Sequence, residues 1–382
     1  MINIPKHWKI KKLGEIGIFF KGKGVPKNKI TDTGFKCLTY GDLYTKYDFV
    51  IEGVKSFIDK ETALISQEIR YGDICFAGSG ETLEDIGKCA TFIDDEIGYA
   101  GGDIIVFRTE QNPIVMSYLL NSDIAKKQKF SMGQGHSVVH IYSSQLEMLK
   151  LPIPPLEEQE KIAEILLSCD KAIRLTTQII TQLKQRNQGL AQQLLTGEKR
   201  VKGFENSIWK EVKLGELLDY EQPTNYLVKN TDYSDEYKIP VLTAGKTFIL
   251  GYTNEKEGIC TNIPLILFDD FTTDSRYIDF PFKVKSSAVK LLKTKKNVNL
   301  RFIFEAMKLI KYAIGGHKRH WISKYAFLTI FVPSFKEQNA IAQILDTAHQ
   351  ELKLYEQKLQ LLQAQKKTLI QKLLTGEVLT IK

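Results

Sequence analysis

Two long segments of the chain carry apolar residues at alternating intervals of three and four positions. The first spans residues 156–198 and the second spans 335–377, and they align in register at an offset of 179 residues. This heptad spacing is typical of an α-helix with one apolar seam. The predicted seam positions are Ile162, Leu166, Cys169, Ile173, Thr176, Ile180, Leu183, Asn187, Leu190 and Leu194, then Ile341, Leu345, Ala348, Leu352, Tyr355, Leu359, Leu362, Lys366, Leu369 and Leu373.

The ends of both helices are marked in the sequence. Pro154 and Pro155 precede the first helix and Pro333 precedes the second, and a proline suits a helix start while keeping the residue before it extended. The sequence LLTGE ends both segments, at Glu198 and Glu377, and its glycine suits a left-handed helix cap. We therefore predict two helices of roughly forty residues, each about 60 Å long.

Two such helices in one chain are expected to pack on each other as an antiparallel pair. The polar seam residues Asn187 and Lys366 occupy the same repeat position. Antiparallel packing would place them near opposite ends, where a polar group reaches water more easily and can fix the register. The alternative is that each helix docks on its own domain.

The blocks before the helices differ from each other. An opening motif, WKIKKLGE at 8–15, returns as WKEVKLGE at 209–216, but the stretch that follows is shorter in the second half. Short β-prone runs with glycine and aspartate fill both blocks, and the second adds a helical stretch at 299–313. We predict a pseudo-two-fold repeat of mixed α/β (α+β) domains at 1–152 and 201–332, with helices within 153–200 and 333–382. Two copies are too few for a solenoid.

Composition is consistent with two cores of ordinary size. The chain has 382 residues, of which 43% are hydrophobic, and no apolar run suits a membrane span or a signal peptide, so we expect a cytoplasmic protein. The five cysteines lack metal-ligand spacing and are interpreted as small buried hydrophobes. The formal net charge of +8 permits a nucleic-acid partner without requiring one.

Motifs for catalysis are largely missing. The chain has no glycine-rich cofactor loop after a strand, no Asn/Asp-Pro-Pro-aromatic loop and no GxxxxGK[ST] motif. Two histidine pairs, His136 with His140 and His317 with His320, lack a Glu or Cys at useful spacing for a metal. Both lie in glycine-flanked polar loops before the last strand of each half. Such loops fit contact with base edges and phosphates, and a solvated loop is the alternative.

Charged clusters leave two further interpretations. Asp269, Asp270 and Asp274 form an acidic group, which fits either a Mg²⁺ nuclease assisted by Lys283 or Lys285, or acceptance of a hydrogen bond from cytosine N4. Lysines interleaved with aromatic residues fit binding to a duplex backbone. These lysines are Lys21, Lys23, Lys27, Lys29 and Lys246.

The whole chain resembles the specificity subunit of a type I restriction-modification enzyme. The resemblance is carried by the helix starts IPPLEEQEKIAEIL and VPSFKEQNAIAQIL and by the two LLTGE endings. GDICFAGSGETLEDIGKCATF with YAGGDIIVFR is similar to one target-recognition domain type, and VLTAGKTFILGYTNE with FDDFTTDSRYIDFPFKVKSSAVKLL to another. Ser334 departs from the family, which often has a second proline there.

The resemblance implies two target-recognition domains, each reading half of a bipartite, asymmetric site in double-stranded DNA, separated by an antiparallel coiled coil. It implies no catalytic residues, metal or cofactor in this chain and no membrane. The implied partners are two DNA adenine methyltransferase subunits and restriction/translocase subunits, which would carry S-adenosylmethionine, ATP and Mg²⁺. A stand-alone DNA-binding or regulatory protein of the same fold stays open, as does the nuclease.

The candidate DNA-binding residues are loop residues chosen by chemistry and position. The lysines are expected on phosphates and the others near bases. In the first domain they are Lys21, Lys23, Tyr40, Asp42, Ser79, Glu81, Gln134 and His136, and in the second they are Thr243, Lys246, Thr272, Lys318, Arg319 and His320.

Overall fold

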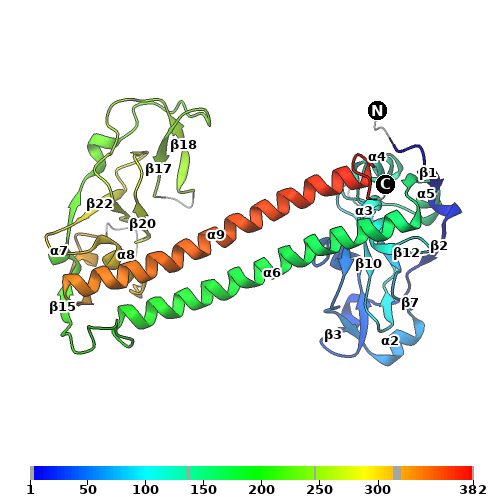
Figure 1. The fold of residues 1–382 in the computed structure, drawn as a ribbon, viewed down its shortest axis with the longest axis horizontal. Coiled ribbons are helices and arrows are strands. Elements are labelled where there is room, and N and C mark those ends of the chain that lie inside the picture. The colour runs from blue at the N-terminus through cyan, green and yellow to red at the C-terminus, as the bar shows by residue number, and fades with distance from the viewer. Residues whose placement is uncertain (1–3, 136–137, 245–246, 313–319, 381–382) are drawn as a thin grey trace. The chain divides into compact units, whose positions relative to one another are not determined.

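The computed structural model describes residues 4–135, 138–244, 247–312 and 320–380. The chain forms two compact units, the first of residues 1–176 with 358–382 and the second of residues 177–357. Each unit contains one mixed α/β domain and a segment of both long helices, α6 (Leu156–Leu195) and α9 (Phe335–Leu374) (Figure 1). The observed helices begin and end close to the residues that the prolines and the LLTGE sequences predict.

Two five-stranded sheets form most of the described part of the first domain. One has the order β2-β12-β8-β10-β5 and the other β3-β6-β4-β11-β7, and two-stranded pairings join β1 to β14 and β9 to β13. The strands are β1 (Lys9–Lys12), β2 (Gly17–Lys21), β3 (Ile30–Thr31), β4 (Phe35–Leu38), β5 (Val50–Ile51), β6 (Phe57–Ile58), β7 (Gln67–Ile69), β8 (Ile74–Ala77), β9 (Ser79–Gly80), β10 (Cys89–Phe92), β11 (Gly98–Ala100), β12 (Ile104–Thr109), β13 (Val139–His140) and β14 (Lys150–Ile153).

Short helices cover the first sheet. The buried helix α3 (Pro113–Leu120) begins where the Asn112 side chain accepts from the backbone N–H groups of Ile114 and Val115. It packs in one core with the start of α6 and the end of α9. The other helices of this domain are α1 (Tyr40–Thr45), α2 (Lys60–Ile65), α4 (Asp123–Met132) and α5 (Ser143–Glu147), with 3₁₀ turns η1 (Leu13–Glu15) and η2 (Lys27–Lys29).

The described part of the second domain has smaller sheets. Their orders are β16-β22-β19-β20, β18-β17-β21 and β15-β23. The elements are β15 (Lys210–Lys213), α7 (Leu214–Leu217), β16 (Leu218–Glu221), η3 (Pro223–Tyr226), β17 (Ile239–Leu242), β18 (Ile249–Thr253), β19 (Leu265–Asp269), β20 (Ser275–Ile278), β21 (Lys283–Val284), β22 (Val289–Thr294), α8 (Leu300–Lys308), η4 (Tyr325–Phe327) and β23 (Thr329–Val332).

Helix α8 is shorter than the sequence predicts. It ends at Lys308, whereas the predicted stretch ran to residue 313. Leu309, Ile310 and Tyr312 leave the helix and pack against the core of the second domain. Tertiary packing therefore overrides the helical preference of these residues.

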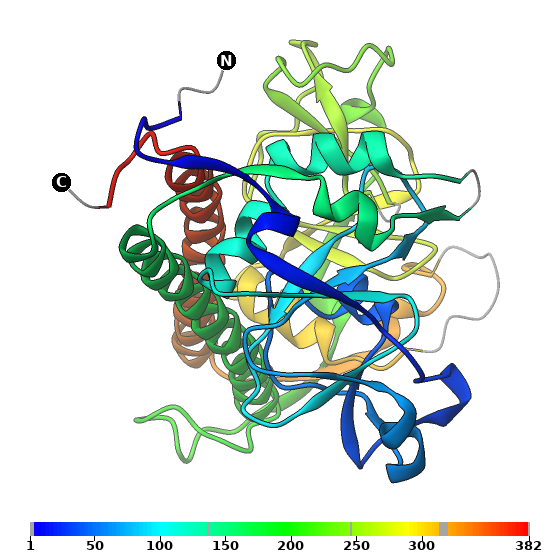
Figure 2. The same cartoon turned by 90° about the vertical axis from the view of Figure 1, so that its right-hand side faces the viewer.

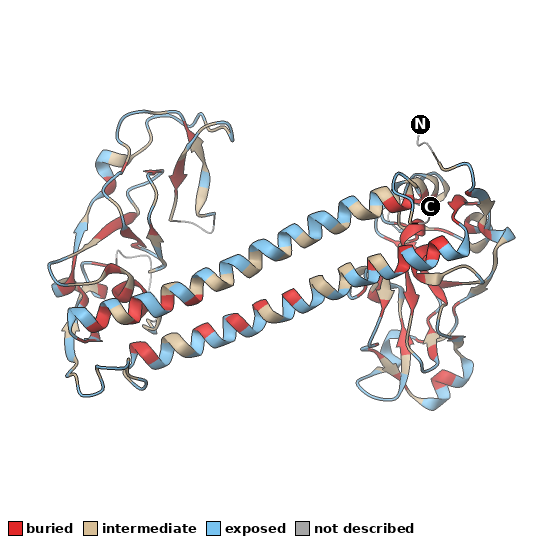
Figure 3. Cartoon of the chain, viewed as in Figure 1, coloured by how far each residue is buried: buried red, intermediate tan, exposed pale blue. Residues whose placement is uncertain are grey.

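Within each unit, α6 and α9 pack antiparallel along the predicted seam. Every predicted seam position is buried or partly buried, while the outer faces are exposed (Figure 3). In the second unit, Arg186 of α6 pairs with Glu351 of α9 at 2.7 Å, and in the first unit Asp170 of α6 pairs with Lys366 of α9. The turned view shows the two helices side by side in each unit (Figure 2). The predicted antiparallel pairing is confirmed.

The prediction that the polar seam residues reach water is wrong for Asn187. This side chain is 8% exposed, and its Nδ2 donates to the backbone carbonyl of Ala348 on α9 at 2.9 Å. Ala348 is the small residue of the opposing seam, which brings the α9 backbone within reach of the amide. Asn187 therefore fixes the register from inside the seam, by a bond to the partner helix.

The repeated Glu–Gln pair attaches the start of each long helix to its domain. In the first unit, Gln159 Oε1 accepts from the backbone N–H of Asn112 at 2.8 Å, and its Nε2 donates to the carbonyl of Pro154 at 2.7 Å. In the second unit, Gln338 accepts from Asn299 at 2.9 Å and donates to Pro333 at 2.9 Å. Both asparagines cap a domain helix, α3 or α8, so the same amide joins two helix starts twice in the chain.

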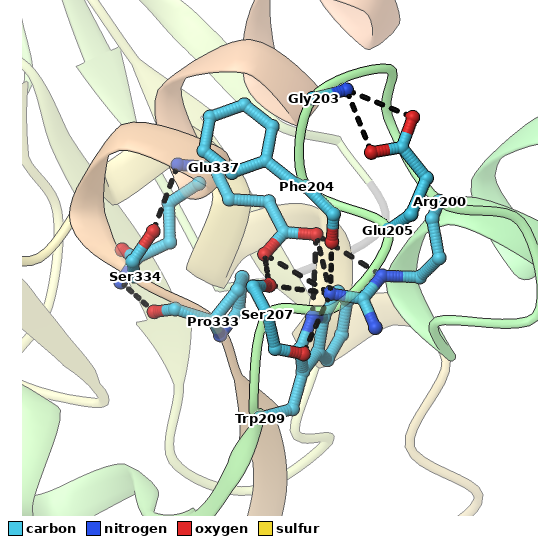
Figure 4. A network of polar contacts seen from close by, with 10 residues as sticks. Arg200, Gly203, Phe204, Glu205, Ser207, Trp209, Pro333, Ser334 and Glu337 are labelled. Carbon is cyan, nitrogen blue, oxygen red and sulfur yellow. Dashed lines mark hydrogen bonds and ion pairs between the residues drawn. The ribbon is translucent and has the colours of Figure 1, made fainter.

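The glutamate of this pair binds the tryptophan of the opening motif. Trp8 Nε1 donates to the Glu158 carboxylate at 2.9 Å, and Trp209 Nε1 donates to that of Glu337 at 3.3 Å. The Glu337 carboxylate also forms an ion pair with Arg200 at 3.0 Å and accepts a hydrogen bond from the hydroxyl of Ser207 (Figure 4). Both carboxylates are almost fully buried, so these donors offset the cost of removing a charge from water.

The end of each long helix docks on the other domain's opening motif. Gly197 follows α6 with φ +75° beside the Trp209 ring, and Gly376 follows α9 with φ +71° against Pro5 and Trp8. A side chain at Gly376 would meet Pro5 Cγ at 2.1 Å, so glycine is required both by its backbone angle and by space. The repeated segments thus supply the joint at both ends of each helix.

Candidate functional site

A cavity of about 730 Å³ lies on the first domain where several predicted residues meet. It brings Tyr40 together with Ser79 and Glu81, which lie far from it in the sequence. Its described lining is Tyr40, Gly41, Tyr44, Thr45, Ser79, Gly80, Glu81, Thr82, Asp85 and Val138. The volume is sufficient for a nucleobase edge or a comparable polar group to enter.

Helix α1 presents one wall of this cavity. The Asp42 carboxylate accepts from the backbone N–H and the hydroxyl of Thr39, both at 2.8 Å, and pairs with Lys46 at 2.7 Å. Asp42 is 6% exposed and does not line the cavity, so it holds the start of α1. The Tyr40 ring is 42% exposed and forms part of the wall.

The opposite wall is the loop 79–88, which begins at β9. Ser79 is buried, and its hydroxyl is 3.0 Å from Nδ1 of His140 on the paired strand β13. The Tyr44 hydroxyl donates to the backbone carbonyls of Ser79 and Asp85, each at 3.2 Å. Burial raises the pKa of Tyr44 to about 12, so the hydroxyl stays a donor at neutral pH.

Glu81 and Asp85 present carboxylates at the cavity. Both are exposed, and neither forms an ion pair in the part of the chain that the structure describes. A carboxylate accepts hydrogen bonds only, so it selects groups that donate, such as the amino groups of cytosine N4 or adenine N6. The cavity therefore has the chemistry to recognise an amino group.

The remaining predicted residues of the first domain surround this cavity. Gln134 is exposed and its backbone forms a two-way bridge with His140, at 3.0 and 2.8 Å. Lys21, at the end of β2, and Lys23 are exposed outside the cavity lining. His136 lies outside the described residues. Thr82 and Asp85 also line the cavity, although neither was predicted from the sequence.

The described candidate residues of the second domain do not line one cavity together, unlike those of the first domain. Thr243 is partly exposed and Thr272 is exposed, with its hydroxyl donating to Asp269 at 2.5 Å. His320 is 1% exposed, and its Nδ1 is 3.2 Å from the Tyr312 hydroxyl. Lys246, Lys318 and Arg319 lie outside the described residues.

Asp269 and Asp270, two members of the acidic group of the second domain, form hydrogen bonds and an ion pair within that domain. Asp269 accepts from the backbone N–H groups of Phe271 at 2.9 Å and Thr272 at 3.3 Å. Asp270 accepts from the backbone N–H of Trp321 at 2.8 Å and pairs at 3.4 Å with Lys290, both side chains being fully buried. In the described ranges, no group of three or more His, Cys, Asp or Glu residues is placed to hold a metal ion.

Of the two lysines predicted to assist a nuclease site, Lys283 is buried, and Lys285 is exposed with its ammonium 5.9 Å from the centre of the Tyr233 ring. Lys283 pairs with Glu255 at 2.8 Å and donates to the carbonyl of Glu257 at 2.6 Å. It therefore ties β21 to the segment after β18. None of the described helices combines the length and apolar character needed to cross a membrane.

The fold is a tandem pair of mixed α/β domains, each attached to repeated antiparallel helices by the same joint residues. The family model described as the type I restriction modification DNA specificity domain matches residues 5–185 and again residues 206–364. The chain belongs to this family of type I restriction-modification specificity proteins, as its sequence predicts.

Individual relatives agree with this assignment. The type I restriction enzyme EcoR124I/EcoR124II specificity subunit of Escherichia coli is 48% identical over 146 residues, which span 35% of this chain and only 36% of that protein. A putative type I restriction enzyme MjaX specificity subunit of Methanocaldococcus jannaschii is 26% identical over 412 aligned positions, covering 98% of this chain and 94% of the relative.

A solved structure shares the fold over almost the whole chain. The crystal structure of a type I restriction-modification S subunit from M. genitalium superposes with a TM-score of 0.67 at 17% identity, covering 97% of this chain and 96% of that one. At this identity the likeness shows the fold alone.

Proposed function

We propose that this chain is the DNA-recognition subunit of a type I restriction-modification complex and reads a bipartite, asymmetric site, with one domain for each half-site. The observation that carries the proposal is that equivalent joints, made by Gln159 and Gln338, hold two domains with different sheets. A repeated scaffold with unlike domains suits an asymmetric target, because each domain can present its own loops to a separate group of base pairs. The predicted domains at 1–152 and 201–332 and the helices within 153–200 and 333–382 are part of this proposal.

In the first domain, the proposed readers are the exposed side chains around the cavity. Tyr40, Glu81 and Gln134 face solvent and carry groups that contact base edges. Lys21 and Lys23 are proposed to bind phosphates, where each neutralised charge releases counterions and makes affinity fall with salt. Asp42 and Ser79 are proposed to act indirectly, because both are buried and bonded within the domain, and His136 remains a proposed reader.

In the second domain, Thr243 and Thr272 are the described candidates for base contact. Lys246, Lys318 and Arg319 remain proposed readers on the chemistry of their side chains, since arginine pairs with guanine and lysine with guanine or phosphate. His320 is proposed to act indirectly, because it is buried and its Nδ1 lies 3.2 Å from the Tyr312 hydroxyl.

The proposed complex supplies the chemistry from other chains. Its members are two DNA adenine methyltransferase subunits and the restriction/translocase subunits, which would bind S-adenosylmethionine, ATP and Mg²⁺. This chain is proposed to be non-catalytic. Support comes from the second domain, where Asp269 and Asp270 are committed to loop and core bonds.

The test is to express this chain with its methyltransferase subunits in a host without other adenine methylation and to map modified adenines. A two-part motif with a fixed gap is the expected result. Replacing residues 1–150 by another reading domain should then change one half of the motif and leave the other half and the gap. A continuous motif, no methylation that depends on this chain, or alteration of both halves by the exchange would overturn the proposal.

A further inference from the structure

Lys129 is a buried lysine next to the cavity of the first domain. It lies on α4 and is 1% exposed. Its ammonium donates to the backbone carbonyl of Gly87 at 2.6 Å and lies 6.0 Å from the centre of the Phe76 ring. Asp48, Glu84 and Asp85 line the small cavity that Lys129 also lines, but in the described ranges none of them forms an ion pair with its ammonium.

Burying an ammonium without a paired carboxylate is costly, so packing alone does not account for a lysine here. A methionine would fill a similar volume without the desolvation cost. The lysine differs from methionine in one respect, because it satisfies the carbonyl of Gly87, a buried residue with φ +68°. A buried carbonyl without a hydrogen-bond donor is destabilising. The side chain therefore stabilises one particular conformation of the loop 79–88.

The loop that Lys129 holds is the wall that carries the cavity carboxylates. Glu81, Thr82 and Asp85 face the cavity, while Ile86 is buried in the core. The loop is fixed at β9 by pairing with β13, and near its middle by the Tyr44 hydroxyl on the carbonyl of Asp85. Lys129 fixes the far end of the loop, just before β10.

Helix α4 also leads directly into the other loop of the site. It ends at Met132, and the next residues include Gln134, whose backbone bridges to His140 on β13. A side chain on Gly133 would lie 2.7 Å from Cδ2 of Leu83, so the end of α4 touches the loop 79–88 closely. Lys129 is therefore the polar link between the helix that carries one loop and the wall formed by the other.

We infer that Lys129 is a positioning residue for DNA recognition, setting the placement of Glu81 and Asp85 and with it the base preference of the first domain. The inference rests on the proposed function and deepens it. The inference predicts an effect on the first half-site only, because Lys129, Glu81 and Asp85 all belong to the first domain.

The test compares Lys129→Met with Lys126→Met in the complete complex with methyltransferase subunits. Lys126 lies on the same helix and lines the small cavity that Lys129 also lines, but it is exposed. Binding and methylation are measured on duplexes with single-base changes in either half of the mapped motif. K129M should lose about tenfold or more of its discrimination at one or more positions of the first half-site, as expected for one misplaced base contact, and none in the second. K126M should match the wild type.

Hydrogen exchange supplies a second measurement on the same variants. In K129M, the amides of residues 81–88 should exchange faster while those of α3 stay protected, as expected for a loop released at one end. Unchanged first half-site discrimination in K129M overturns the inference, as does an equal loss in both half-sites. If K129M does not assemble, Lys129→Leu, which likewise lacks a donor for the Gly87 carbonyl, is compared in the same way and the same outcomes decide.

The failure of this inference is distinguishable from failure of the proposed function. If the wild-type chain directs no methylation to a two-part motif, the proposed function is wrong. If it does so and K129M keeps its discrimination, only the role of Lys129 is wrong.

Discussion

Lys366 of α9 forms an ion pair with Asp170 of α6, and the same carboxylate accepts the hydroxyl of Tyr118. The ammonium also lies 4.9 Å from the centre of the Phe49 ring and 5.2 Å from that of Tyr118. A single lysine in the helix seam therefore joins both long helices to the first domain. The arrangement resembles an aromatic cage completed by a carboxylate.

Loss of the carboxylate at Asp170 should destabilise the first unit strongly. Asp170→Asn leaves the ammonium of Lys366, which is 13% exposed, without its counter-charge, and we expect a loss of about 2–4 kcal/mol in the free energy of unfolding. The matched control is Glu356→Gln, which removes the charge from a solvent-exposed ion pair between Glu356 of α9 and Lys184 of α6 and should cost less than about 1 kcal/mol. Denaturant unfolding followed by far-UV circular dichroism measures both. Equal losses of unfolding free energy in the two variants would show that the Asp170–Lys366 pair stabilises the chain no more than an exposed ion pair does.

The glutamine joints should be equally important in the two units. Gln159→Ala and Gln338→Ala each remove an amide that bridges a buried helix start to a proline carbonyl. Each variant should lose about 2–4 kcal/mol, because two backbone groups lose their partners. The exposed Gln350→Ala on α9 serves as the control and should be nearly neutral. A neutral effect at either joint would mean that water replaces the amide.

Removing the charge of Glu81 should change which base is preferred. Glu81→Gln replaces an acceptor-only group by one that also donates, so preference for a base with an amino group should fall by about 1–3 kcal/mol, or roughly 5- to 150-fold. Glu84→Gln is the matched control, since Glu84 is an exposed acid of the same loop that does not line the larger cavity. Competition binding with single-base variants of the first half-site measures the change. Similar shifts in both variants would point to a general charge effect.

Burial of Lys129 predicts a characteristic dependence of stability on pH. Burial lowers the pKa of Lys129 from 10.5 to about 8 in the folded chain. Between about pH 8 and pH 10.5 the unfolded chain therefore binds more protons, so this residue's penalty on stability is full below pH 8 and is relieved as the pH rises. The full penalty is on the order of 3 kcal/mol. Other groups near this lysine are Asp48, Glu84, Asp85, Lys88, Lys126 and Cys89.

The measurement is the difference in unfolding free energy between the wild type and K129M, taken across pH 7 to 10.5. This difference isolates Lys129 from the other groups that titrate in the same range, such as Cys89, whose pKa burial raises to about 11. The unfolding free energy of the wild type should increase relative to that of K129M as the pH rises. A difference that stays flat with pH would show that the ammonium is solvated in the native chain.

The periodic parts of the molecule could be predicted from the sequence, whereas the partners of individual polar residues could not. The seam and both helix ends follow from local spacing, so α6 and α9 were predicted nearly to the residue. The environment of Asn187 depends on which α9 residue lies opposite, and the sequence does not contain that register. It therefore gave no sign that the amide would bond to the carbonyl of Ala348.

The candidate site shows the same division. Tyr40 and Glu81 were selected by loop chemistry, and the structure places both on one cavity. Asp42 and His320 were selected by the same reasoning, but both are buried and bonded within their own domains. Side-chain chemistry does not distinguish a residue that supports a loop from one that faces a ligand.

The glycines that end the long helices bear on how such proteins diversify. Gly197 and Gly376 pack on the opening motifs of the two domains, and both lie in the identical LLTGE sequence. A recombination event with crossovers inside the repeated segments would import a foreign domain together with residues that already fit these sockets. Such an exchanged domain would then need no compensating mutations along the helices.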